Sequence, residues 1–178
     1  MLPPTLLVRG RPNPRHQKLG QRLKRARKAA GLTRTALARI ACISHPMVRQ
    51  IEEAGRTPGI DLAEALALAL GLSPCHLAYG APVESTATGL ESSGIGRRLL
   101  AARELRGLSR NGLGKAAGLS HTAIGVIEAG KVMPGVDTAE DLADVLRLSV
   151  CWLAYGEGDM EPLQGQRGAR RPSSSRAI

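Results

Sequence analysis

Apolar residues recur at helical spacing near the start of the chain. Leu19, Leu23, Ala26 and Ala30 fall on one face of a helix, and the run stops at Gly31, where left-handed backbone costs little. The pattern therefore predicts a first helix that begins near Leu19 and ends before Gly31.

Polar residues mark the starts of four further short helices. Thr33, Ser44 and Ser73 stand where N-caps would open a second, a third and a fifth helix. Asp61 with Glu64, and Asp137 with Glu140 later in the chain, have the spacing of a capping box that opens a fourth helix. Five short helices are thus expected in residues 19–80.

The same pattern occurs twice. A shift of 76 residues aligns residues 19–80 with 95–156 without a gap, and 29 of the 62 aligned positions are identical. We therefore expect an all-α protein of two tandem five-helix domains, 19–80 and 95–156. Residues 81–94 read as a flexible linker, and residues 1–18 and 157–178, which are rich in Pro, Gly, Ser and Arg, are expected to be mostly disordered.

Composition supports this fold class. The chain has no Phe, one Trp and two Tyr, so aliphatic residues must form the core, which suits compact helices. Three cysteines without metal-ligand spacing predict neither a disulfide framework nor a zinc site, and we expect no cofactor. Cys75 and Cys151 recur beside apolar neighbours and are interpreted as small buried hydrophobic residues rather than redox sensors. No membrane segment is expected, and the chain reads as cytoplasmic.

Charge is unevenly distributed. Residues 1–56 hold 13 Lys or Arg and 2 Glu, which gives +11, whereas the remaining residues sum to −1 because the whole chain carries +10. Segregated positive charge favours a polyanion as partner, most often nucleic acid. A merely well-solvated surface is the alternative.

Residues 32–58 and 108–134 resemble the helix-turn-helix of the Cro/repressor-type (XRE) family of regulators. The first copy matches at Leu37, Ala38, Ser44, Val48, Ile51, Glu52 and Pro58, and the second at Leu113, Ser120, Ile124, Ile127, Glu128, Gly130 and Pro134. Two departures occur: Ala54 replaces the Gly that usually follows the recognition helix, and Arg34 and Arg110 stand where Gln is common. The resemblance implies two λ-repressor-like domains that bind double-stranded DNA, with Arg27–Glu52 and Arg103–Glu128 as structural ion pairs.

In this family the third helix enters the major groove, where each base pair offers a distinct pattern of donors and acceptors. The first copy would present His45, Met47, Arg49 and Gln50 there, with Arg34 placed to meet a phosphate. The alternatives are a solvated charge for Arg49, core packing for Met47 and a structural role for His45.

The second copy offers Arg110, His121 and Thr122, but its remaining outward positions are Ala123, Gly125 and Val126. Its net charge is +2 against +5 for the first copy. We expect it to read DNA weakly, or to serve as a dimerisation or docking module.

The N-terminal segment carries the sequence Arg-Gly-Arg-Pro, residues 9–12, which resembles the core of an AT-hook. Arg9 and Arg11 would either enter an A·T-rich minor groove or add plain phosphate contacts, and both roles would steepen the salt dependence of binding.

The sequence thus predicts a transcriptional regulator, more often a repressor in this family, that acts as a homodimer or as an intramolecular pseudo-dimer. The 14-residue linker can extend to about 46 Å, and successive major grooves on one face of DNA lie about 34 Å apart. An antitoxin-like or anti-repressor interaction factor is the alternative. No enzyme is expected, because no nucleophile and base cluster at usable spacing.

Overall fold

The computed structural model describes residues 15–81 and 94–160, and within these ranges the regular structure is entirely helical. A short 3-10 helix, η1 (Arg15–Lys18), leads directly into the first repeat. That repeat holds five α-helices: α1 (Leu19–Ala29), α2 (Arg34–Ile40), α3 (His45–Glu53), α4 (Ile60–Ala69) and α5 (Pro74–Tyr79). The second repeat holds five: α6 (Ile95–Leu105), α7 (Arg110–Ala117), α8 (His121–Glu128), α9 (Val136–Leu146) and α10 (Val150–Tyr155). The predicted all-α fold with two five-helix repeats is confirmed.

Most of the predicted helix ends are confirmed. The Thr33 hydroxyl accepts a hydrogen bond from the Ala36 N–H at 3.1 Å, and the same contact is made by Ser73, Ser109, Ser120 and Ser149. Ser44 occupies the N-cap position of α3, although its side chain makes no capping hydrogen bond. Gly31 takes the left-handed conformation just after α1, at φ 67°.

The predicted capping boxes are wrong. The N-caps of α4 and α9 are Gly59 and Gly135, so these helices begin earlier than Asp61 and its repeat counterpart would require. The reason lies in the other repeat, because the two glycines form an antiparallel β-bridge with each other. The Ile60 N–H donates to the Pro134 carbonyl and the Val136 N–H to the Pro58 carbonyl, each at 3.1 Å, and the two helices start from these contacts.

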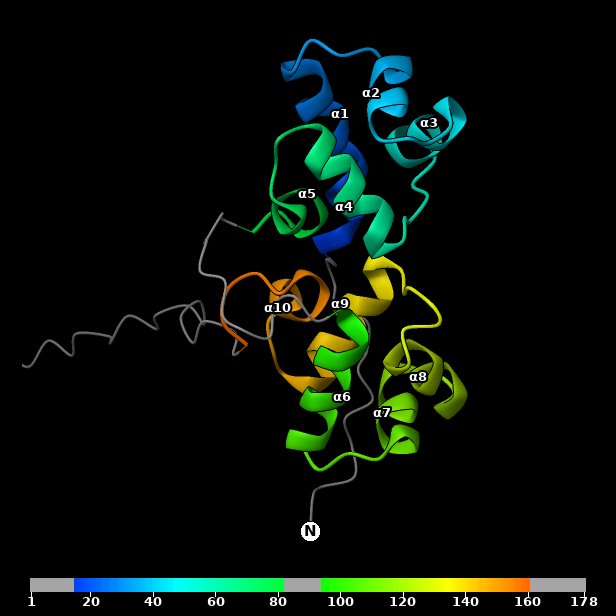
Figure 1. Cartoon of the computed structure of the whole chain (residues 1–178), viewed down its shortest axis with the longest axis vertical. Coiled ribbons are helices and arrows are strands. Elements are labelled where there is room, and N and C mark those ends of the chain that lie inside the picture. Colours follow the sequence, from blue (N-terminus) through cyan, green and yellow to red (C-terminus); the bar gives the residue numbers. More distant parts are fainter. Residues whose placement is uncertain (1–14, 82–93, 161–178) are drawn as a thin grey trace, which may run out of the picture.

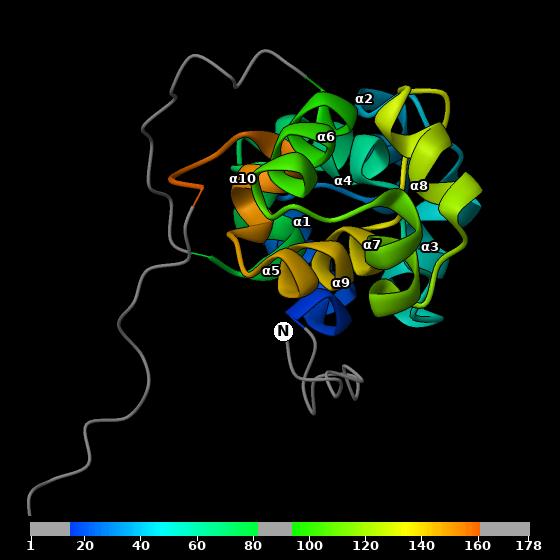
Figure 2. The ribbon, with the colours of Figure 1, turned by 90° about the horizontal axis from the view of Figure 1, so that it is seen from below.

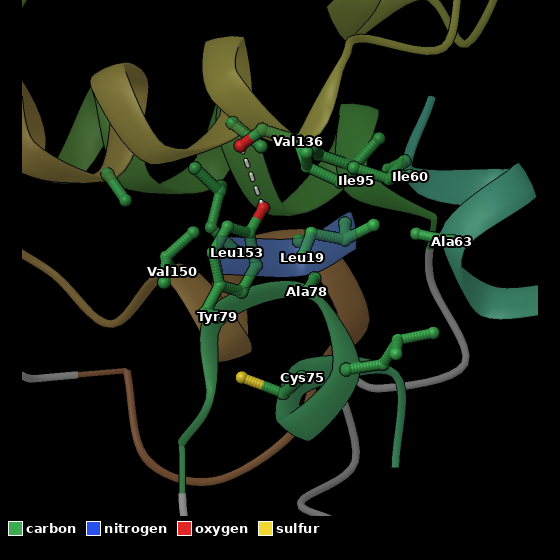
Figure 3. Close-up of a cluster of buried hydrophobic side chains, with 14 of the residues drawn as sticks. Leu19, Ile60, Ala63, Cys75, Ala78, Tyr79, Ile95, Val136, Val150 and Leu153 are labelled. Carbon is green, nitrogen blue, oxygen red and sulfur yellow. Dashed lines mark hydrogen bonds between the residues drawn. The ribbon is translucent and has the colours of Figure 1, made fainter. Parts of the chain in front are cut away.

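This bridge belongs to an extensive interface between the repeats, in which α4 contacts α9 and α5 contacts α10 (Figures 1 and 2). One apolar core runs through both repeats. Figure 3 shows Leu19 and Tyr79 of the first repeat among Ile95, Val136 and Leu153 of the second, and the Tyr79 hydroxyl donates to the Val136 carbonyl at 3.0 Å. Equivalent elements therefore meet across the interface, α4 with α9 and α5 with α10.

The interpretation of Cys75 and Cys151 as merely small buried hydrophobic residues is wrong. They form a disulfide that joins α5 to α10, with a Cα–Cα distance of 5.3 Å, within the range that disulfides require. Cys75 is buried, as expected, but the bond was not predicted, because residues 76 positions apart meet only when two repeats pack through their last helices. Cys42 is a free, exposed cysteine.

Residues 15–18 lie in the segment that was expected to be mostly disordered, and the structure has them as η1. The backbone N–H groups of Arg15 and His16 donate to the carboxylate of Glu140 in α9, at 3.0 and 3.2 Å, and His16 Nδ1 lies 2.8 Å from Glu140 Oε2. Burial opposes ionisation of Glu140, but these hydrogen bonds outweigh it and lower the pKa of Glu140. The start of the first repeat is thereby fastened to the second.

None of the helices in the described ranges is long and apolar enough to cross a membrane.

Candidate nucleic-acid interface

The core of each repeat fixes its third helix against its first. Val48 and Ile51 of α3 are buried, and Gly20 of α1 passes so close to the Ile51 carbonyl oxygen that a Cβ atom at position 20 would lie 2.2 Å from it. Gly96 of α6 makes the same approach to the Ile127 carbonyl of α8. A larger residue at either glycine would push the third helix away, so these positions set where its outer face lies.

A buried carboxylate next to this contact also fixes the third helix. Arg27 Nε donates to Glu52 Oε1 at 2.6 Å and Arg27 Nη2 to Glu52 Oε2 at 3.0 Å. In the second repeat Arg103 Nε donates to Glu128 Oε1 at 2.6 Å. These geometries agree with the structural ion pairs that the sequence predicted.

Arg34, which was expected to meet a phosphate, also binds the buried carboxylate of Glu52. Its Nε donates to Glu52 Oε2 at 2.7 Å, and its Nη2 contacts Glu53. The hydrogen bond to Glu52 raises the pKa of Arg34. Burial opposes ionisation of Glu52, but hydrogen bonds from Arg27 and Arg34 outweigh that effect and hold the pKa of Glu52 below its ordinary value.

Arg110 makes the equivalent contact in the second repeat, with Nε donating to Glu128 Oε2 at 2.7 Å. Its side chain is 52% exposed, against 25% for Arg34, so more of its guanidinium faces solvent. Each arginine at the start of the second helix is therefore oriented by the glutamate of the third.

The predicted DNA-contacting side chains of α3 differ in their exposure to solvent. His45 and Arg49 are exposed. Met47 is half-buried against the core, which favours the packing alternative. Gln50 is half-buried, and its Oε1 accepts a hydrogen bond from Arg56 Nη1 at 2.7 Å. The sequence did not predict this role for Arg56, because it depends on the course of the loop after α3.

The departure at Ala54 has a structural explanation. Gly55, rather than residue 54, takes the left-handed conformation after α3, at φ 66°. In the second repeat Gly130, which aligns with Ala54, does so after α8 at φ 67°. Consequently α3 has nine residues and α8 has eight, and the first repeat has a longer recognition helix.

The outer face of α8 is nearly apolar, as the sequence indicated. His121 and Thr122 are exposed at its start, with Thr122 Oγ1 3.5 Å from His121 Nε2. Val132 and Met133 are each 50% exposed in the following loop, at the positions of Arg56 and Thr57 in the first repeat. This loop thus has apolar side chains where the first repeat has polar ones.

The two third helices lie on the same side of the molecule, and both views agree on this arrangement (Figures 1 and 2). Arg9 and Arg11 lie outside the described residues. Among the residues that are described, no three His, Cys, Asp or Glu side chains are grouped so as to hold a metal ion.

Comparison with known proteins agrees with the presence of two helix-turn-helix units. The sequence matches the helix-turn-helix family HTH_3 over residues 23–77 and again over residues 99–153. The chain is 40% identical over 68 residues to the uncharacterized HTH-type transcriptional regulator YazB of Bacillus subtilis (strain 168), covering 38% of this chain and 99% of that protein.

A solved structure, the restriction-modification controller protein C.AhdI from Aeromonas hydrophila, is similar at 33% identity and a TM-score of 0.33 over 34% of this chain and 92% of its own. The family match covers more than half of the chain, in two separate segments. The chain therefore belongs to the XRE-type helix-turn-helix family of transcriptional regulators and carries two tandem copies of the family's domain.

Proposed function

We propose that this chain binds double-stranded DNA as a single-chain pseudo-dimer, with α3 and α8 directed at one duplex. The observation that carries the proposal is the position of both third helices on one side of the molecule, with the repeats joined by the reciprocal bridge between Gly59 and Gly135. Two-fold arrangements of this kind match half-sites about one helical turn apart on DNA.

The first repeat is proposed as the sequence-specific half. Arg49 and His45 are exposed on α3, and the Gln50 side chain is held by Arg56. Arg contacts guanine, and Gln adenine, through two-point hydrogen bonds worth about 1–3 kcal/mol of discrimination each.

The second repeat is proposed to contact mainly the backbone. Arg110 keeps a half-exposed guanidinium for a phosphate, and His121 and Thr122 are the polar side chains at the start of α8. The operator would then have one well-defined half-site and one degenerate half-site. Binding within a promoter would repress transcription by excluding the polymerase.

Two matched double variants test this division. The operator is first obtained by selection from random duplex DNA with the full-length protein. Arg49→Ala with Gln50→Ala is expected to reduce the ratio of operator to scrambled-DNA affinity at least tenfold, whereas His121→Ala with Thr122→Ala is expected to change it less than threefold. Equal effects of the two variants in a gel-shift titration would contradict the assignment.

Stoichiometry tests the pseudo-dimer itself. Sedimentation of protein with operator DNA is expected to show one chain per duplex. Two chains per duplex would show that a homodimer is the binding unit. Run-off transcription from a promoter that contains the operator then tests repression, and an increase in transcript would show activation instead.

A further inference from the structure

The excess positive charge of the first repeat is not on its recognition helix. The first repeat carries +5 and the second +2, a difference of three charges. Four positions of α1 (Gln21, Lys24, Arg25 and Lys28) carry +3, and their counterparts in α6 (Arg97, Leu100, Ala101 and Glu104) sum to zero. Outside these four positions both repeats carry +2, so the α1 stripe accounts for the whole difference.

The stripe faces away from α3. Leu19, Leu23 and Arg27 form the buried side of α1, which packs on α3. At about 100° per residue the stripe is centred roughly 150° around the helix from that side. Gln21, Arg25 and Lys28 are exposed, and the four side chains line one shallow hollow. Because α3 packs on the buried side of α1, the stripe lies on the face of α1 that is turned away from the helix proposed to hold the operator.

In the part of the chain that the structure describes, the three cations of the stripe have no carboxylate as an ion-pair partner. Within residues 15–81 and 94–160, the ion pairs involve other side chains, and no carboxylate lies within ion-pair distance of Lys24, Arg25 or Lys28. By contrast, three other arginines of the first repeat make contacts within the protein. Arg27 and Arg34 bind Glu52, and Arg22 donates to the Leu77 carbonyl of α5. The stripe is therefore available to an external anion.

We propose that the α1 stripe binds the phosphate backbone of a second DNA segment, so that one chain joins two duplexes. This inference rests on the proposed function, since the first duplex is the operator held through α3. The stripe spans about 10 Å along the helix, the axial rise of three phosphates on one strand. It contains no aromatic side chain on which unpaired bases could stack, which favours double-stranded over single-stranded nucleic acid.

A two-colour bridging assay with the full-length chain tests the proposal. One labelled duplex carries the selected operator, and a second carries a scrambled sequence. The test variant is Lys24→Ala with Arg25→Ala, which removes two charges from an exposed helix face while keeping good helix formers. The control, Arg97→Glu, changes the net charge by the same amount at the aligned, exposed face of α6.

Wild-type protein and the Arg97→Glu control are expected to hold both duplexes together, with second-duplex affinities within threefold of each other. The test variant is expected to keep its operator affinity within threefold and to lose at least tenfold in affinity for the second duplex. Equal bridging by the test variant, or no bridging by wild-type protein, would overturn the proposal while operator binding stands.

A poly-glutamate peptide serves as a third probe, which tests whether the stripe binds acidic proteins instead of DNA. If a poly-glutamate peptide binds wild-type protein but not the test variant, and the second duplex binds neither, the stripe is a surface for acidic proteins and the DNA proposal is overturned. Failure of wild-type protein to bind any selected operator would instead refute the proposed function and this inference with it.

Discussion

The disulfide between Cys75 and Cys151 gives the sharpest prediction about stability. The perturbation is reduction of the bond with dithiothreitol, or its removal in the Cys75→Ala, Cys151→Ala double variant. Both changes leave the contacts between α5 and α10 in place and remove the covalent link between them. All proteins carry Cys42→Ser, because Cys42 is exposed and would form mixed disulfides.

The magnitude follows from the length of chain that the bond closes. The two cysteines are 76 residues apart, and the loss of entropy in the unfolded chain on closing a loop of this length corresponds to about 4.5 kcal/mol. For a protein of this size, that free energy corresponds to a fall in Tm of about 9–18 °C on reduction.

Calorimetry of the oxidised protein, the reduced protein and the double variant measures this effect. The reduced protein and the double variant are expected to melt at similar temperatures, both well below the oxidised protein. Peptide mapping without reductant is expected to show one cross-linked pair containing Cys75 and Cys151.

Two results would refute the reasoning. A fall in Tm of less than about 3 °C on reduction would mean that residual structure in the unfolded chain already restricts it as much as the bond does. Recovery of both cysteines as alkylated thiols from protein isolated under air would mean that the bond does not form.

Three further predictions concern single positions. Cys42 has a left-handed backbone at φ 55° where the second repeat has Gly118, so Cys42→Gly is expected to stabilise the protein by about 1 kcal/mol in urea denaturation, and a loss of stability would contradict the strain argument. Tyr79→Phe removes a buried hydrogen bond and is expected to lower the free energy of unfolding by about 1–2 kcal/mol. Tyr155→Phe removes a buried hydroxyl that has no partner in the described part of the chain, and is expected to lower it by less than about 0.5 kcal/mol. Equal losses in urea denaturation would refute this contrast. Folding lowers the pKa of Glu52, so the stability that Glu52 contributes is present above its unfolded pKa of about 4.3 and is lost as pH falls through the lower folded pKa. Glu52→Gln is therefore expected to cost about 3 kcal/mol of unfolding free energy at pH 7 and to make stability depend less steeply on pH in acid. An unchanged pH midpoint of acid unfolding would show that other carboxylates control it.

The fold within each repeat could be predicted from local signals. Apolar spacing and the caps at Thr33 and Ser109 depend on neighbours a few residues away, and the structure agrees with them. The pairing of Arg27 with Glu52 followed from the family resemblance, because that motif fixes the distance between the first and third helices.

The relation between the repeats could not be predicted in the same way. The disulfide, the bridge at Gly59 and the attachment of η1 to Glu140 all depend on which faces of the two repeats meet. A sequence of two similar units does not contain that information in any short window. Glu140 illustrates the difficulty: its spacing from Asp137 suggested a helix cap, yet its carboxylate is used by the other repeat.

The antiparallel bridge between Gly59 and Gly135 has a consequence for evolution and for dosage. In a homodimer every substitution appears twice, and site occupancy at low concentration rises with the square of protein concentration. In this chain a substitution in α8 leaves α3 unchanged, so the two halves can diverge independently. In the proposed single-chain binding mode a non-palindromic site would become accessible. The partner domain would always be present at a fixed ratio, so occupancy would follow the first power of concentration, and a cell with few copies of the protein would respond in a graded manner.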